Sequence, residues 1–244
     1  MPGSTLGTGV PETVRAALAD RPVEGQVCLE AGAGVGNTTA GLLESGAGRV
    51  YAVTDDADHA AAVQRRCGDD DRVDVVRADL RATPLRPDSV ELVSAHGLCN
   101  LLDPAALEDV AAELTRVAAP GSHLVVDDYD PLPEDAAVRR LFAVENAASE
   151  LADGRPALTF YPAALLKRVF EGHGWSFDRE RTLLDPVPWT ESHLSAHTRA
   201  ACEAAGRLPD DLGAPLERAA DRVAADVGAA STGRMYSLAF RWSE

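Results

Sequence analysis

A glutamate followed by closely spaced glycines is the feature of this sequence best suited to chemistry. In VCLEAGAGVGNTT, residues 27–39, an apolar run ends at Glu30, and Gly32, Gly34 and Gly36 follow at alternate positions. Glycine adopts positive φ angles and has no Cβ to block a ligand, so this loop can turn tightly and bring backbone N–H groups close to a bound molecule. The polar residues after Gly36 predict a helix, whose N-terminal end favours a carboxylate or a phosphate.

The glutamate and the glycine spacing discriminate among the ligands that such loops bind. A dinucleotide fingerprint is G-x-G-x-x-G, whereas here the third glycine comes one place early and Asn37 takes the usual slot. Glu30 would repel a pyrophosphate and attract a cation instead. A ligand that combines an ammonium, a carboxylate and an adenosine fits both features better.

Strand and helix patterns alternate through the first half of the chain, which predicts a parallel sheet with helices on both faces. Ligands of such sheets bind at the carboxyl ends of the strands, where the glycine loop lies. The predicted strands span residues 26–30, 49–53, 73–77, 89–95, 123–127, 175–181 and 235–242. The predicted helices span residues 11–19, 37–44, 58–66, 104–118, 134–152, 162–172, 191–206 and 214–227.

Several stretches, in this order, resemble the motifs of class I methyltransferases that use S-adenosylmethionine (SAM). VCLEAGAGVG resembles the first motif, E/D-x-G-x-G-x-G, RVYAVTDDAD the second, and VVRADLRATPLRPDSVELVSA the third and fourth. LEDVAAELTRVAAPGSHLVVDDY, YPAALLKRVFEGHGW and MYSLAFRW resemble later elements of the family. The resemblance covers roughly residues 10–184 and 234–242. It implies a Rossmann-like three-layer α/β sandwich, with a mostly parallel seven-stranded sheet, a reversed last strand and helical insertions.

The resemblance also implies SAM as the cofactor and assigns residues to it. In the family an acid at the end of the second strand holds the ribose hydroxyls; here Thr54 takes that slot and Asp55 follows. Asp79 matches the acid that accepts from the adenine amino group, with Leu80 beside the ring. The cofactor residues expected from the resemblance are Glu30, Gly32, Gly34, Gly36, Thr54, Asp55, Asp79, Leu80 and Ser94.

The candidate catalytic residue is His96, in the stretch SAHGLCN after the fourth strand. The family transfers a methyl group by in-line displacement, largely through positioning and desolvation, and it has no universal catalytic residue. His96 is expected to be a base or a substrate contact, and the alternative is a polar residue that closes the cofactor pocket. The N/D-P-P-Y/F motif of enzymes that methylate nucleobase amino groups is absent there, which favours a small-molecule acceptor over nucleic acid.

Other polar residues are not expected to form a metal site. Asp128, Tyr129 and Asp130 follow the fifth strand and are expected to form a solvated acidic loop rather than to bind Mg²⁺. His193 and His197 lie four positions apart, as some metal ligands do, but no third ligand is evident. We therefore expect a surface pair.

The 244 residues fit a single methyltransferase domain over 1–244, with helical cap insertions at about 131–160 and 185–233. These insertions would cover the carboxyl end of the sheet, as expected for a small, partly apolar substrate; the alternative is a dimer surface, and a monomer or a homodimer is expected. Tyr161 and Trp189 flank the insertions and are expected to be packing anchors.

The chain is strongly acidic, with a net charge of −16 and Lys167 as its only lysine. This composition resembles that of proteins from salt-loving archaea, and the alternative is an ordinary acidic protein from a GC-rich genome. The sequence has no signal-peptide pattern and no apolar run that could cross a bilayer, which predicts a cytoplasmic protein without a membrane partner. The cysteines form no CxxC pair and are expected to be buried thiols: Cys28, Cys67, Cys99 and Cys202.

Three other functions stay open. A regulatory protein that binds SAM without catalysis would share every motif above and would give no product. A nicotinamide-dependent oxidoreductase is disfavoured by Glu30 and the early third glycine, and would bind NAD. An aminopropyl transferase on the same fold would carry acidic motifs around the fourth strand, which are not present.

Overall fold

The computed structural model describes residues 9–242, and its centre is one seven-stranded sheet. The strand order is β3-β2-β1-β4-β5-β9-β6, and β9 runs antiparallel to both of its neighbours. The predicted sheet with its reversed last strand is therefore confirmed. The strands are β1 (Val27–Ala31), β2 (Arg49–Thr54), β3 (Val73–Arg77), β4 (Val90–His96), β5 (Ala118–Tyr129), β6 (Trp175–Leu184) and β9 (Met235–Trp242).

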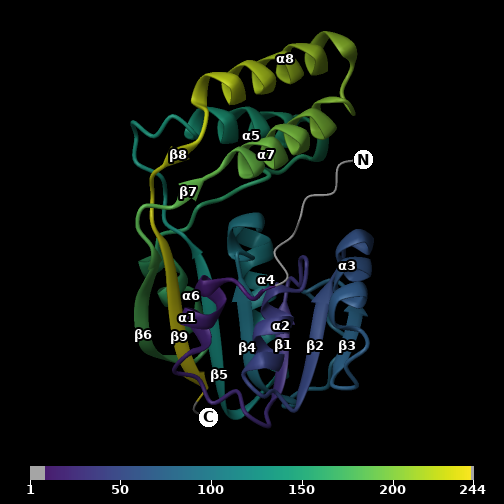
Figure 1. The fold of residues 1–244 in the computed structure, drawn as a ribbon, viewed down its shortest axis with the longest axis vertical. Coiled ribbons are helices and arrows are strands. Elements are labelled where there is room, and N and C mark those ends of the chain that lie inside the picture. Colours follow the sequence, from purple (N-terminus) through teal and green to yellow (C-terminus); the bar gives the residue numbers. More distant parts are fainter. Residues whose placement is uncertain (1–8, 243–244) are drawn as a thin grey trace.

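Helices cover both faces of this sheet (Figure 1). On one face, α1 (Glu12–Leu18), α2 (Asn37–Glu44) and α3 (Ala57–Cys67) pack on the strand residues Cys28, Val50, Ala52 and Leu92. On the other face, α4 (Pro104–Val117) and α6 (Ala163–Gly172) pack on Leu29, Val93 and Val126. Because successive strand residues point to opposite faces, Glu30, Ser94 and His96 lie on the same face as Cys28 and Leu92.

A layer of three helices stands above the carboxyl ends of the parallel strands (Figure 1). It consists of α5 (Arg139–Asp153), α7 (Glu191–Ala205) and α8 (Asp210–Val227), with a two-stranded sheet of β7 (Pro188–Trp189) and β8 (Ala230–Ser231). We call this layer the cap. It has an apolar core of its own, built around Leu141, Phe142, Trp189 and Leu194.

Some boundaries differ from those predicted. The helix expected from residue 134 begins at Arg139, because residues 133–138 form turns whose backbone carbonyls accept from the first N–H groups of α5. The helix expected from residue 214 begins at Asp210, after Pro209, and Pro215 lies within it. The β7–β8 pair was not predicted, since each of its strands has only two residues.

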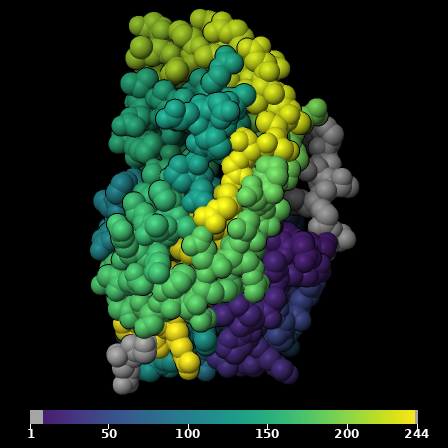
Figure 2. Space-filling model, turned by 90° about the vertical axis from the view of Figure 1, so that its left-hand side faces the viewer, coloured from purple at the N-terminus to yellow at the C-terminus, as the bar shows by residue number. Residues whose placement is uncertain are grey.

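Charged contacts just after α1 fasten it to the edge strand β6. In Figure 2 the purple N-terminal segment lies against the green one. Asp20, just after α1, bonds Arg179 Nε at 2.8 Å, and Arg21 bonds Asp178 at 2.6 Å. Burial raises the pKa of Asp20, but the hydrogen bonds and charges of Arg179 and Arg21 outweigh it and hold the pKa well below its usual value.

Among the helices of residues 9–242, none is both long and apolar enough to cross a membrane.

Candidate functional site

The glycine loop joins β1 to α2 at the carboxyl edge of the sheet. Gly32 has a φ of +79°, which favours glycine, and a Cβ there would lie 2.9 Å from Leu98 Cδ1, at the end of a side chain that could shift. The N–H groups of Gly32 and Ala33 donate to Val53 O at 3.0 and 2.8 Å, which fixes the loop to the end of β2. A Cβ at Gly34 would meet nothing within 4 Å. Space therefore lies open where the loop faces away from the protein.

Glu30 lies behind this loop and supports it. Its side chain is 3% exposed, and Oε2 accepts from the Thr39 N–H at 2.9 Å and from the Thr39 hydroxyl. Burial raises the pKa of Glu30, while the hydrogen bonds from Thr39 oppose that rise. The carboxylate thus holds the first turn of α2 against β1 and places negative charge beside the loop.

The expected residues of β2 and β3 lie along the same edge. Thr54 is buried, with Oγ1 accepting from Asp56 N at 3.3 Å, and Asp55 beside it is exposed. Asp79 is half-exposed, and Arg81 Nη2 bonds its Oδ2 at 2.7 Å, a contact that the sequence analysis did not foresee. The hydrogen bonds from Arg81 lower the pKa of Asp79. Leu80 is partly buried against the main core.

Ser94 and His96 lie on β4 next to the glycine loop. Ser94 pairs in register with Glu30 of β1 and is 1% exposed, and its hydroxyl has no hydrogen-bond partner among the described residues. His96 pairs in register with Asp127 of β5, and its Nδ1 lies 2.8 Å from Asp127 Oδ2. The structure therefore brings Glu30, Ser94 and His96 together, and adds Asp127.

The acids after the predicted fifth strand do not form a solvated loop, so that expectation was wrong. β5 continues to Tyr129, and Asp128 is fully buried, accepting from Asn100 N at 2.9 Å and Tyr129 N at 2.8 Å. Asp130 bonds Arg234 Nε at 2.6 Å. Burial raises the pKa of Asp128 to about 7, although the backbone donors oppose the rise. Backbone N–H groups from a distant turn make this burial possible.

The histidine pair in the cap is only partly at the surface. His193 is exposed, as expected, but His197 is half-buried and its Nδ1 lies 2.9 Å from Oε2 of the buried Glu145. Within residues 9–242, no group of three or more His, Cys, Asp or Glu side chains is placed to hold a metal ion. His197 thus links α7 to α5.

Aromatic side chains gather where β5 meets the cap. Tyr129 has ring contacts with Trp189 at 5.6 Å and Phe160 at 6.5 Å, and Phe142 contacts Trp189 at 5.1 Å. A pocket of 260 Å³ adjoins them, lined by Pro131, Leu132, Arg139, Phe142, Ala143, Asn146 and Phe160. Trp189 and Tyr161 are both buried, which confirms them as packing anchors.

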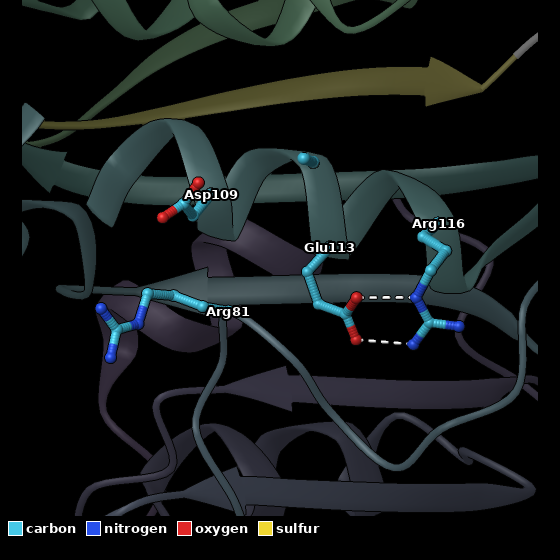
Figure 3. Close-up of a pocket in the computed structure, with 5 residues that line it drawn as sticks. Arg81, Asp109, Glu113 and Arg116 are labelled. Atoms are coloured by element: carbon cyan, nitrogen blue, oxygen red, sulfur yellow. Dashed lines mark hydrogen bonds and ion pairs between the residues drawn. The ribbon is translucent and has the colours of Figure 1, made fainter. Parts of the chain in front are cut away.

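A second hollow, of 530 Å³, lies beside α4 and is shown in Figure 3. Glu113 there pairs with Arg116 at 2.6 Å and also accepts from the Thr83 N–H at 2.8 Å and the Thr83 hydroxyl at 2.6 Å. Arg116 also donates a hydrogen bond to Leu85 O at 2.9 Å. These side chains satisfy one another and fasten the loop after β3, so we assign this hollow a structural role.

Sequence reasoning missed two residues that shape the site. Arg66 of α3 reaches the glycine loop, donating to Asn37 Oδ1 at 2.6 Å and to Val35 O at 3.3 Å. Asp127 is the partner of His96, and its only sequence signal is an acid at the end of the buried run LVVDD. Neither contact is visible without knowing which strands and helices are neighbours.

Comparisons with known proteins agree with this arrangement. Residues 29–126 match the model of the family described as methyltransferase domain, a segment that runs from β1 through most of β5 and includes the glycine loop and His96. A demethylmenaquinone methyltransferase of Clavibacter sepedonicus is 35% identical over 113 residues. That match covers 46% of this chain and 44% of the relative, so the chain spans less than half the length of this curated relative.

Solved structures share the fold over almost the whole chain. The [4+2]-cyclase SpnF has a TM-score of 0.63 at 16% identity, over 94% of this chain and 79% of that one. Geranyl diphosphate C-methyltransferase from Streptomyces coelicolor A3(2), solved with Mg²⁺, geranyl diphosphate and S-adenosylhomocysteine, has a TM-score of 0.60 at 17% identity, over 93% and 76%. Residues 29–126 thus match the methyltransferase-domain family, and the chain has the fold that these solved proteins share.

Proposed function

We propose that this protein is a SAM-dependent methyltransferase that acts on a small-molecule acceptor. The observation that carries the proposal is the glycine loop, where open space faces Gly34 while Glu30 is buried behind the loop. The family match over residues 29–126 supports the same reading of this loop. A loop with free backbone and a buried carboxylate suits a ligand that has both an amino-acid end and a positive charge.

The described residues fit this cofactor. Gly32, Gly34 and Gly36 would hold its amino-acid end at the start of α2, and Thr54 with Asp55 would hold the ribose. Leu80 would contact the adenine ring, and Asp79 would accept from the adenine amino group once Arg81 is displaced. When bound, SAM supplies an activated methyl group on a cationic sulfonium. The orphaned hydroxyl of Ser94 gives the pocket one further polar contact.

The acceptor is proposed to bind under the cap. We propose that residues 131–160 and 185–233 are insertions into a single domain, and the 260 Å³ pocket beside Phe142 and Phe160 supports a small, partly apolar acceptor. Methyl transfer would then rest on holding the acceptor and the methyl group together with water excluded. Such positioning can supply roughly 7–11 kcal/mol of a reaction barrier.

We also propose the cellular environment of the protein and the kinds of partner that it lacks. The net charge of −16 and the single lysine support a cytoplasm rich in salt, as in haloarchaea, and a protein without nucleic-acid or membrane partners. The protein is proposed to be a monomer if the cap only covers the substrate, or a homodimer if the cap also forms a dimer surface.

A cofactor assay and a turnover assay test the function together. Calorimetric titration in molar KCl should show binding of S-adenosylhomocysteine and none of NAD, because the charge of Glu30 beside the loop disfavours a pyrophosphate. Incubation with SAM and a panel of small acceptors should then release S-adenosylhomocysteine. Binding of NAD alone would indicate an oxidoreductase and overturn the proposal.

A second candidate is a SAM-binding protein with another role. The observation behind it is that SpnF, which is named as a cyclase, shares this fold at a TM-score of 0.63. Tight binding of S-adenosylhomocysteine with no methylated product from any acceptor would favour this candidate. The same binding experiment therefore separates the cofactor question from the question of the reaction.

A further inference from the structure

His96 is held in one orientation at the end of β4. Its Nδ1 lies 2.8 Å from Oδ2 of Asp127, which is 1% exposed. An ionised carboxylate can only accept hydrogen bonds, so the proton of the neutral imidazole belongs on Nδ1. The lone pair is then on Nε2, the nitrogen through which an imidazole acts as a base.

The other nitrogen of His96 is left available. Among the hydrogen bonds and ion pairs of residues 9–242, none uses His96 Nε2, and the side chain is 21% exposed although the strand around it is buried. Two buried polar atoms beside it also have no partner in the described part of the chain: Asp127 Oδ1 and Ser94 Oγ. Buried polar atoms are almost always hydrogen-bonded, so these two orphaned atoms beside the accessible Nε2 point to a water or ligand bound there.

The charges that face His96 favour its protonated form. Glu30 on β1 and Asp127 on β5 lie on the same face as His96, while Asp128 points to the other face, next to Cys99 and Tyr236, and still adds its charge. Burial lowers the pKa of His96, but the hydrogen bond and charge of Asp127 and the charges of Glu30 and Asp128 outweigh it, and the pKa is raised. A proton that arrives on Nε2 is therefore stabilised.

We propose that His96 is the general base of this site, that Asp127 positions it, and that the acceptor is methylated at an atom that carries a weakly acidic proton, such as a phenolic oxygen. The proposal rests on the methyl transfer proposed above. In the reaction the bond from sulfur to the methyl carbon breaks and the bond from that carbon to the acceptor atom forms. The acceptor proton moves to His96 Nε2 and later to solvent, and the products are the methylated acceptor and neutral S-adenosylhomocysteine.

The state of His96 can be measured by ¹⁵N NMR of the labelled protein, with His96→Gln used to assign the signal among the histidines. The neutral ring should carry its proton on Nδ1, and the titration midpoint should lie above 6.5. Asp127→Asn should lower the midpoint by about one pH unit, a tenfold loss in proton affinity, and should mix the two tautomers. A packing role for Asp127 would move neither quantity.

A comparison of two ligands on the unaltered protein does not depend on the folding of any variant. Saturating SAM should lower the His96 midpoint relative to saturating S-adenosylhomocysteine, because the two differ by one methyl group and its positive charge. Equal midpoints, or a neutral ring protonated on Nε2, would overturn the role of His96 while leaving the proposed function intact. An acceptor that proves to be a tertiary amine or a thioether would also overturn it, since neither has a proton to lose. If neither ligand binds, the proposed function fails and this proposal fails with it.

Discussion

At the scale of single residues, the edge of the sheet holds more buried acidic side chains than an ordinary core. Glu30, Asp127 and Asp128 are each 3% exposed or less, and no arginine or lysine pairs with them in the described part of the chain. Backbone donors, the Thr39 hydroxyl and His96 bond them instead, although Asp127 Oδ1 has no partner among the described residues. Such a site favours a cationic ligand, since a positive charge there has little competition from the protein's own cations.

Asp128 should make folding depend on pH. Burial raises its pKa to about 7 from an unfolded value of 3.8, so the folded state binds more protons between these limits and stability falls as the pH rises through them. Asp128→Asn removes this ionisation. Between pH 4 and pH 8 the stability of the variant should therefore fall less than that of the native protein, by about 2–4 kcal/mol at about 1.4 kcal/mol per unit of pKa.

Urea unfolding at several pH values checks this expectation, with Asp130→Asn as the matched control in the next position but one. Asp130 is paired with Arg234, so its substitution should not give the same gain at high pH. A stability difference between Asp128→Asn and the native protein that does not change with pH would show that Asp128 keeps an ordinary pKa.

At the scale of elements, the sequence predicted the bounds of those strands and helices that depend on a local pattern of residues. The strand from Met235 to Trp242 and the helix from Asn37 to Glu44 match their predicted bounds, because alternation and helical periodicity are local signals. The end of β5 was misjudged, since the burial of Asp128 depends on the N–H of Asn100, which lies 28 residues away in the chain. Glu30 and His96 were found from motifs, whereas Asp127 needed the register between β4 and β5.

The cap pocket gives a prediction that belongs to α5. Ala143 lines the pocket, and Ala147, one turn further along the same helix, is exposed and does not line it. Ala143→Trp should fill part of the 260 Å³ and weaken binding of the apolar anion 8-anilinonaphthalene-1-sulfonate by about tenfold, or 1.4 kcal/mol. Ala147→Trp should leave the fluorescence titration unchanged. Equal effects of the two substitutions would show that the probe binds elsewhere.

At the scale of the whole molecule, the net charge of −16 sets how the protein responds to salt. Repulsion among exposed acids is screened over about 10 Å at 0.1 M salt and about 3 Å at 1 M. The melting temperature should therefore rise as KCl increases from about 0.1 to about 2 M, by several degrees. Calorimetry across this range of KCl concentration tests the expected rise. A melting temperature that is constant or falls would contradict the proposed adaptation to salt.

Substitution of exposed acids gives the control for that experiment. Asp69 and Asp71 are both exposed in an acidic turn after α3, and replacing both by Asn removes two negative charges without touching the core. The double variant should show a smaller salt response than the native protein. An unchanged response would indicate that salt acts on something other than surface repulsion.

The most direct test of the proposed cofactor site is a pair of glycine substitutions. Gly34→Leu and Gly172→Leu both place a side chain where a Cβ meets nothing within 4 Å, and neither glycine has a positive φ, so both variants should fold. Gly34 lies in the loop, whereas Gly172 lies at the end of α6. Calorimetric titration with S-adenosylhomocysteine should show binding to the native protein and to Gly172→Leu, and a loss of at least about a hundredfold in Gly34→Leu, or 2.8 kcal/mol. Equal binding by Gly34→Leu and the native protein would contradict the placement of the cofactor at this loop.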